Sequence, residues 1–300
     1  MKNELKKLKE AYENWGSGNY SATALIGEKW GGLTSLITQF TTTEQFSQTI
    51  IRISVSGRLN DEKSFIQLIC EQLDIESKGN IDELIDSLNN LPSKRIIIIE
   101  DIQKMFLRTI HGFEGFKALF KILANTNKNI FWLVSCTIYA WNYLKQILSI
   151  EDYFSNVVII ENLNQEQMVE IIKRRNEISG LNVVFEPDDS QIMKKKLKGL
   201  NEEEQQSFLS KNYFTALSDF SESNISLALL FWLLSTKEIS DNKLIVGYFK
   251  KPDLSFVKVI KMDRILVLMS LILHDGLNDL DLARVNNITQ EEAKLKLIIL

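Results

Sequence analysis

The sequence predicts an α/β protein with a three-layer αβα core around a parallel five-stranded sheet, followed by helices alone. Five apolar segments alternate with helical segments up to Asn162, which is the pattern of strands joined by crossover helices. Four consecutive isoleucines at 96–99 indicate a strand that is buried on both faces, as in the middle of a parallel sheet. After Asn162 the strand signal fades.

Each element of the core follows from its own pattern of apolar residues. Continuous or alternating apolar runs, closed by glycine or polar residues, predict strands at 21–27, 50–56, 95–101, 129–136 and 156–161. Apolar residues three and four positions apart predict helices at 1–15, 33–41, 62–73, 80–88, 113–124 and 140–148.

The rest of the chain reads as helical. Helices are predicted at 165–179, 191–197, 202–208, 224–235, 255–273, 280–285 and 289–300. We therefore expect three domains, which are the core at 1–162, an all-helical domain at 163–237 and a helix-turn-helix at 238–300. The turn Asn286-Asn287 has the spacing of that motif. Because the sequence stops inside the last helix, a β-wing is not expected, and we expect a longer protein with a further C-terminal segment.

Composition excludes several classes of function. The formal net charge is −4, which argues against generic binding to nucleic acid or to a membrane surface. The two cysteines stand at unrelated positions, so a disulfide framework or zinc site is not predicted. The longest apolar run, 225–234, is too short to span a bilayer, and the charged N-terminus is not a signal peptide. We expect a cytoplasmic protein.

The segment from Ala24 to Leu36 carries the strongest functional signal. A buried strand leads into glycines and then into a helix, which is the layout of a phosphate-binding loop of the pattern G-x-x-x-x-G-K-[ST]. Gly27 and Gly32 have the required separation, and Thr34 stands where a hydroxyl reaches Mg²⁺. Leu33 replaces the lysine. The loop therefore predicts a nucleotide site that lacks its main cation.

Three questions about this loop stay open in the sequence. An ordinary strand-turn-helix corner would also explain two glycines and a threonine. Lys29, inside the loop, is either a substitute for the missing lysine or a solvated loop cation. Trp30, at the loop tip, either shields the site or stacks on a base or a partner.

The two histidines, His111 and His274, are expected to be surface or packing residues.

The second signal is the acidic end of the isoleucine strand, Glu100-Asp101. Two acids at the carboxyl end of a buried strand lie where parallel sheets place their ligands. A polar strand end that caps the next loop is the alternative. The favoured interpretation is a site for Mg²⁺ and a nucleotide, ATP or ADP.

With these motifs the chain resembles an AAA+ or STAND-like P-loop ATPase module of the origin-recognition branch, over essentially its whole length. The resemblance implies that Glu100 holds the Mg²⁺ shell with Thr34, and that Asp101 polarises the attacking water, although the family usually has the shorter acid first. It also implies a γ-phosphate sensor at Ser135 or Thr137, and a helical lid at 163–237 entered through 162–167. The lid segment 224–229 lacks the usual sensor arginine. The candidate nucleotide-binding residues are Gly27, Lys29, Gly31, Gly32, Leu33, Thr34, Ser35, Ser135 and Thr137.

The sequence thus predicts a regulatory ATP-binding module with a degenerate Walker A loop and weak or no hydrolysis. It would relay nucleotide state through the lid and winged-helix-like region to a protein partner or C-terminal segment, and it could form a homo-oligomer. An active Mg²⁺-dependent ATPase is the first alternative. An origin-recognition-like DNA-binding ATPase is the second. DNA is disfavoured because residues 240–300 carry a net charge of +1, and Glu291 and Glu292 open the would-be recognition helix.

Overall fold

The structure, a computed structural model, describes residues 2–44, 46–76, 79–126 and 128–300. The chain forms two compact units. The first consists of the residues up to Ile160 together with Lys258–Leu300, and the second consists of Glu161–Val257. The C-terminal helices therefore belong to the same body as the N-terminal sheet. The division into three functional domains stays a prediction, because these units describe packing alone.

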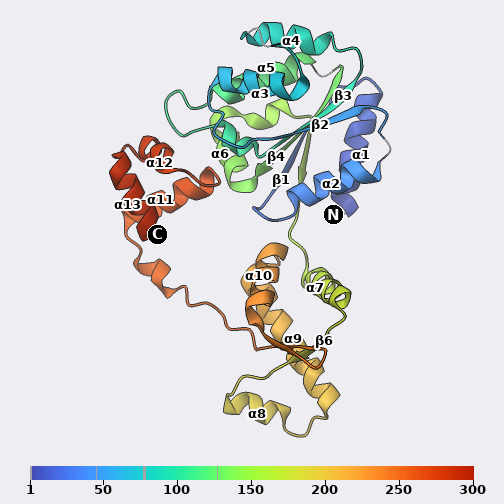
Figure 1. Ribbon diagram of the computed structural model, residues 1–300, viewed down its shortest axis with the longest axis vertical. Helices are drawn as coiled ribbons and strands as arrows, with labels where there is room; N and C mark the ends of the chain where they lie inside the picture. Colours follow the sequence, from blue (N-terminus) through green and yellow to red (C-terminus); the bar gives the residue numbers. More distant parts are fainter. Residues whose placement is uncertain (1, 45, 77–78, 127) are drawn as a thin grey trace. The chain divides into compact units, whose positions relative to one another are not determined.

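The first unit is built around a parallel sheet of five strands in the order β2-β3-β4-β1-β5 (Figure 1). This sheet, with helices on both faces, is an α/β core of the P-loop NTPase type, as the sequence predicts. All five predicted strands are present, with ends that differ by a few residues. They are β1 (Ala22–Gly27), β2 (Thr49–Ser54), β3 (Arg95–Glu100), β4 (Ile130–Thr137) and β5 (Asn156–Ile159).

The isoleucine run shows why the sheet needs helices on both faces. Ile96 and Ile98 pack into one apolar cluster with residues of α1 (Lys2–Gly16) and α2 (Leu33–Thr43). Ile97 and Ile99 point to the other face, where the helices are α3 (Glu62–Leu73), α4 (Ile81–Asn89), α5 (Glu114–Thr126) and α6 (Ile138–Leu148). Figure 1 shows these two layers on opposite sides of the sheet.

The parallel arrangement brings the functional segments to one edge. In the register of β1 and β4, Gly27 lies opposite Thr137. β3 ends at Glu100 beside β4, and a short 3₁₀ helix, η1 (Ile102–Met105), follows it. A second 3₁₀ helix, η2 (Ile150–Tyr153), precedes β5. The carboxyl ends of β1, β3 and β4 therefore meet at the edge where such sheets bind ligands.

Three helices complete the first unit. They are α11 (Met262–Leu273), α12 (Asp279–Asn286) and α13 (Gln290–Ile299), and their small core contains Val267, Leu282, Ala283 and Ala293. The single helix predicted at 255–273 is wrong. A 3₁₀ helix, η3 (Ser255–Val259), comes first, and the extended backbone of Lys261 separates it from α11. The last two helices lie where the sequence predicts them.

The second unit is not all helical, which corrects the prediction for 163–237. Its helices are α7 (Gln165–Ser179), α8 (Gln191–Leu197), α9 (Glu202–Ser221) and α10 (Ile225–Ser235). A three-stranded sheet joins them, with β6 (Asn182–Phe185), β7 (Thr236–Ser240) and β8 (Lys243–Val246) in the order β6-β8-β7. β6 has only four residues and pairs with a strand far along the chain, so it gives no local signal. α9 is longer than predicted because Leu209, Tyr213 and Leu217 continue its buried face.

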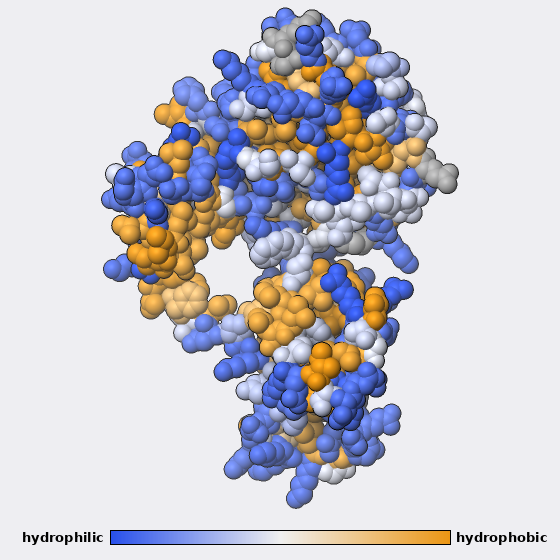
Figure 2. All heavy atoms as spheres, viewed as in Figure 1, coloured by the Kyte–Doolittle hydropathy of each residue, from blue (hydrophilic) through white to orange (hydrophobic). Residues whose placement is uncertain are grey.

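The surface of each unit carries exposed apolar side chains. Figure 2 shows such residues over α10 and over the segment from η3 to α11. On α11 they are Met262, Leu266, Met269 and Ile272. No helix within the described part of the chain is both long and apolar enough to cross a lipid bilayer.

Candidate functional site

The glycine loop joins β1 to α2 through a tight turn. The amide of Gly31 donates to the carbonyl of Glu28 over 2.9 Å. Gly32 precedes α2 with φ 102°, a left-handed conformation that favours glycine. Gly32, the N-cap of α2, has no side chain that could cap the helix. This helix therefore lacks the N-cap side-chain bond that most helices have, and the N–H groups at a helix start are a place where anions bind.

Leu33 does not contribute to the charge of this loop. Its Cδ2 lies 3.3 Å from the position that a Cβ on Gly27 would occupy. The side chain is partly buried and packs against the apolar cluster that contains Leu36 and Val158. The residue in the position of the lysine therefore packs against the apolar core beneath the loop and has no side-chain charge to offer a phosphate.

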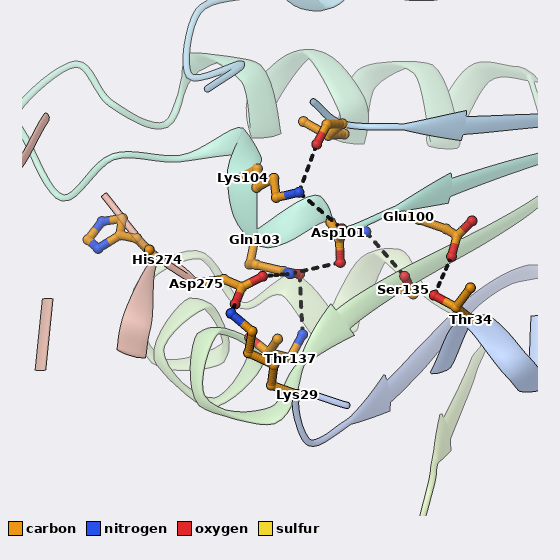
Figure 3. Close-up of polar contacts among 12 residues, drawn as sticks. Lys29, Thr34, Glu100, Asp101, Gln103, Lys104, Ser135, Thr137, His274 and Asp275 are labelled. Carbon is orange, nitrogen blue, oxygen red and sulfur yellow. Dashed lines mark hydrogen bonds and ion pairs between the residues drawn. The ribbon is translucent and has the colours of Figure 1, made fainter. Parts of the chain in front are cut away.

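Thr34 and Glu100 meet as the motif predicts. The Thr34 hydroxyl donates to Glu100 Oε2 over 2.9 Å (Figure 3). The other oxygen, Oε1, accepts a charged hydrogen bond from Arg52 Nε. Arg52 also donates to the Thr38 hydroxyl of α2 over 3.0 Å. Glu100 is almost fully buried, so the guanidinium supplies the positive charge that such a carboxylate requires.

Asp101 is also paired, by residues of the helical turn that follows it. Lys104 Nζ lies 3.1 Å from Asp101 Oδ2, and Gln103 Nε2 donates to Oδ1 over 3.0 Å. The backbone of Asp101 is left-handed, with φ 63°. Its amide donates to the Ser135 hydroxyl over 3.2 Å. The two predicted acids thus lie side by side, and each has its own cation.

The end of β4 lies beside both the loop and the acids. The amide of Thr137 donates to Gln103 Oε1 over 3.3 Å, whereas the Thr137 hydroxyl is buried and has no hydrogen-bond partner in the part of the chain that the structure describes. The neighbouring Cys136 is buried, and burial, followed by the charge of Asp101, raises the pKa of its thiol far above the usual range. Cys136 is therefore not a nucleophile. Ser35 lies exposed in the first turn of α2.

Lys29 is directed to an anion from another part of the chain. Its ammonium pairs with a carboxylate oxygen of Asp275, in the turn between α11 and α12 (Figure 3). The ammonium also lies 5.2 Å from the ring centroid of Trp30. Trp30 is exposed at the loop tip. Lys29 is thus about half exposed, and its ammonium is paired with Asp275 in this structure.

The residues present fit the phosphates of a nucleotide better than they fit Mg²⁺. The helix start at Gly32 follows a glycine turn, and the residue opposite Gly27 in the sheet, Thr137, has a buried hydroxyl with no hydrogen-bond partner among the described residues. The donors for the metal, Thr34 and Glu100, are bonded to each other, and Arg52 occupies the second oxygen of Glu100. Within the described residues, no group of three or more His, Cys, Asp or Glu side chains could hold a metal ion.

The sequence matches no family model and no curated protein. Solved structures similar to the chain include the Aeropyrum pernix ORC1 protein in complex with DNA, at 13% identity and a TM-score of 0.48, covering 98% of this chain and 81% of that chain. The ORC2 protein of the same organism, in ADPNP-ADP complexes, has 13% identity and a TM-score of 0.46, covering 89% of this chain and 72% of that chain. The RuvB branch migration motor of Thermotoga maritima has 15% identity and a TM-score of 0.37, covering 97% of this chain and 83% of that chain. Because these identities and TM-scores are low, the fold is assigned from the strand order and the glycine loop of this chain itself.

Sequence reasoning missed the partners of the predicted residues. Arg52, Gln103 and Asp275 each pair with a predicted site residue. Arg52 left a signal, since it is the one charged residue in the apolar run 50–55. Gln103 follows the acids closely but has no motif. Asp275 lies far along the chain, and no local pattern connects it with the loop.

Proposed function

We propose that the chain is a regulatory nucleotide-binding module, which binds the phosphates of ATP or ADP at the loop 27–34 and hydrolyses ATP weakly or not at all. The observation that carries this proposal is the 2.9 Å hydrogen bond between Thr34 and Glu100. It brings the start of α2 and the acidic end of β3 together, as an NTPase site requires, although the lysine is lost.

Binding would rest on the backbone. The N–H groups at the start of α2 and the helix dipole attract an anion, and Thr137, opposite Gly27 in the sheet, has an unused hydroxyl donor. A lysine would add a charge-assisted hydrogen bond, which contributes about 1.5–3 kcal/mol. Its absence lowers affinity by about 10- to 100-fold, so we expect a weak nucleotide site.

Hydrolysis is disfavoured because both acids are already paired. A general base must bring an oxygen within hydrogen-bond reach of the proton that it abstracts, and the hydrogen bonds that this oxygen already accepts compete with that contact. Glu100 is bonded to Arg52 and Thr34, and Asp101 is bonded to Lys104 and Gln103. Without the lysine, charge that develops on the transferred phosphoryl group is also poorly stabilised.

Isothermal titration with ATP and ADP, with and without Mg²⁺, tests the binding proposal. We expect weak binding to the wild-type chain and about 10- to 100-fold tighter binding to Leu33→Lys. Leu36→Met, a volume-conserving change in the same helix, is the matched control and should leave affinity unchanged. If neither the wild-type chain nor Leu33→Lys binds nucleotide at millimolar concentration, the proposal is wrong.

An active ATPase is the second candidate, favoured by the same Thr34–Glu100 pair. It requires Arg52 to leave Glu100 when Mg²⁺ and nucleotide bind. Phosphate release above the buffer rate, abolished in Asp101→Asn, would support this candidate. A rate equal to buffer for the wild-type chain would exclude it.

The relay of nucleotide state to a protein partner, or to another copy of the chain, is part of the same proposal. The exposed apolar residues of α11 support a protein-binding role for the C-terminal helices. DNA binding is not favoured. Glu292 at the start of α13 is held in a capping box with Thr289, and Lys296 pairs with Asp263 over 2.7 Å. A flat mobility-shift titration at low salt is the expected result.

A further inference from the structure

The turn between α11 and α12, residues 274–276, is anchored on the sheet edge that carries the glycine loop. The guanidinium of Arg58 donates to the carbonyl oxygen of His274 over 2.6 Å and also to that of Gly276. The His274 ring is fully buried, 4.8 Å from the ring of Phe106 between centroids. Its Nε2 accepts from the amide of Arg108 over 3.1 Å. The turn is therefore held in a fixed place by groups of the core.

This anchoring presents one carboxylate to the site. α11 ends at Leu273 with His274 as its C-cap, and Asp275 and Gly276 both have positive φ, at 56° and 99°. The chain reverses sharply there. One carboxylate oxygen of Asp275 pairs with Lys29, and the other accepts from Gln103 Nε2 over 3.3 Å (Figure 3). The Asp275 side chain is only 12% exposed.

Gln103 connects this carboxylate to the predicted catalytic acid. Its amide nitrogen donates both to Asp275 Oδ2 and to Asp101 Oδ1. Its amide oxygen accepts from the amide of Thr137, beside the loop. Gln103 is fully buried, so release of the turn breaks its hydrogen bond to Asp275 and exposes its amide to water, which opposes release.

Lys29 is the only lysine or arginine at positions 27–34. Its ammonium is therefore the only side-chain charge that the loop itself can offer to a phosphate. In the structure that charge is satisfied by Asp275. A carboxylate and a phosphate are both anions that an ammonium binds with charge-assisted hydrogen bonds, so the two compete for the same group.

We propose that Asp275 is an internal competitor of nucleotide phosphate. With Asp275 on Lys29, helices α11–α13 are locked to the core and the loop has low affinity. A nucleotide that recruits Lys29 removes the carboxylate's cation, and the like charges of phosphate and Asp275 expel the turn. Nucleotide binding and the release of α11–α13 are then coupled. Bound nucleotide favours release of the helices, and release of the helices raises nucleotide affinity by the same factor. This inference rests on the proposed function.

The expected effect is moderate, because Lys29 is about half exposed, at 47%, and solvent weakens the pair. Asp275→Asn keeps the shape of the side chain and its tolerance of positive φ, and removes the charge. We expect it to bind ATP about three- to tenfold more tightly than the wild-type chain. Asp241→Asn is the matched control, since Asp241 also has positive φ, at 52°, and lies in the β7–β8 turn of the second unit.

Two measurements on the full chain separate this inference from the proposed function. The first is amide hydrogen exchange of residues 262–276 without ligand. Exchange should be faster in Asp275→Asn and in Lys29→Gln than in the wild-type chain and Asp241→Asn. The second is titration with ATP, where Asp275→Asn should bind more tightly, but not when Lys29→Gln is also present.

Each outcome decides one of the two ideas. If residues 262–276 exchange equally fast in Asp275→Asn and in the wild-type chain without ligand, Asp275 does not hold α11–α13 to the core. The proposal is then wrong, whatever the ATP affinities are. Equal ATP affinity in the two chains, with measurable binding, would overturn the competition and leave the proposed function intact. If exchange rises in Asp275→Asn but no chain binds ATP, Asp275 holds the helices for another purpose, and both the competition and the proposed nucleotide function are wrong.

Discussion

The two sides of the candidate site are held together by different kinds of interaction. The glycine loop depends on the backbone, through the turn at Gly31 and Gly32 and the start of α2. The facing side depends on paired side chains, which are Arg52 with Glu100, Lys104 with Asp101 and Lys29 with Asp275. A backbone cradle keeps its form when a side chain such as the P-loop lysine is replaced. A set of charge pairs does not, because the loss of one member leaves the other unpaired.

The largest change in folding stability is expected on the side that depends on side chains, from protonation of His274 in the turn that presents Asp275. Burial, followed by the charges of Arg58 and Arg108, lowers the pKa of His274 from its usual 6.5 to about 4. The unfolded chain therefore takes up a proton at a higher pH than the folded one. Stability is fully present above pH 6.5 and is lost as the pH falls toward 4, by about 3 kcal/mol in total. Urea unfolding between pH 7.5 and 4 measures this loss.

His274→Gln should flatten that pH dependence while lowering stability at neutral pH, since its buried ring fills space beside Phe106. His111→Gln, at an exposed position, is the control and should follow the wild-type profile. A wild-type profile that stays flat between pH 6.5 and 4 would contradict the assignment.

The next largest effect is expected from Arg52→Gln. The substitution leaves the buried Glu100 without its cation, and an unpaired buried charge costs about 1–3 kcal/mol or more. The midpoint of thermal unfolding measures this loss. A midpoint equal to that of the wild-type chain would show that Glu100 does not depend on the Arg52 guanidinium.

Gly32→Ala tests the backbone side. The left-handed backbone at Gly32 costs an L-residue about 1–2 kcal/mol, and relief of that strain would move the start of α2. We expect lower stability and weaker binding of ATP together. Gly16→Ala, at the end of α1 where an added Cβ meets nothing within 4 Å, should change neither. A loss of stability without any change in ATP affinity would argue that the loop does not bind phosphate.

The smallest effect is expected from Asp101→Asn. The carboxylate is 41% exposed, so solvent already screens its pair with Lys104 and its loss should cost under about 1 kcal/mol. Phosphate release should stay at the buffer level in both chains, as measured with a coupled assay. A clear fall in the rate would instead favour the active ATPase.

The sequence by itself determined the fold class and the meeting of the loop with Glu100. The periodicity of apolar residues in strands and helices is visible in short segments of sequence. Because the carboxyl ends of parallel strands share one edge, Thr34 and Glu100 could be placed together from the sequence alone. Helices α3, α7 and α8 begin and end where their local patterns predict. The polar residues at the ends of strands therefore carried most of the information on the site.

Only the tertiary structure decided which partners those residues have. Arg52 reaches Glu100 because β2 lies next to β3 in a register that puts both side chains on one face. Asp275 reaches Lys29 because three C-terminal helices dock on the sheet edge. β6 exists because β8 pairs with it. Such contacts depend on strand order and docking, which join residues far apart in the chain, and a local pattern of residues contains neither.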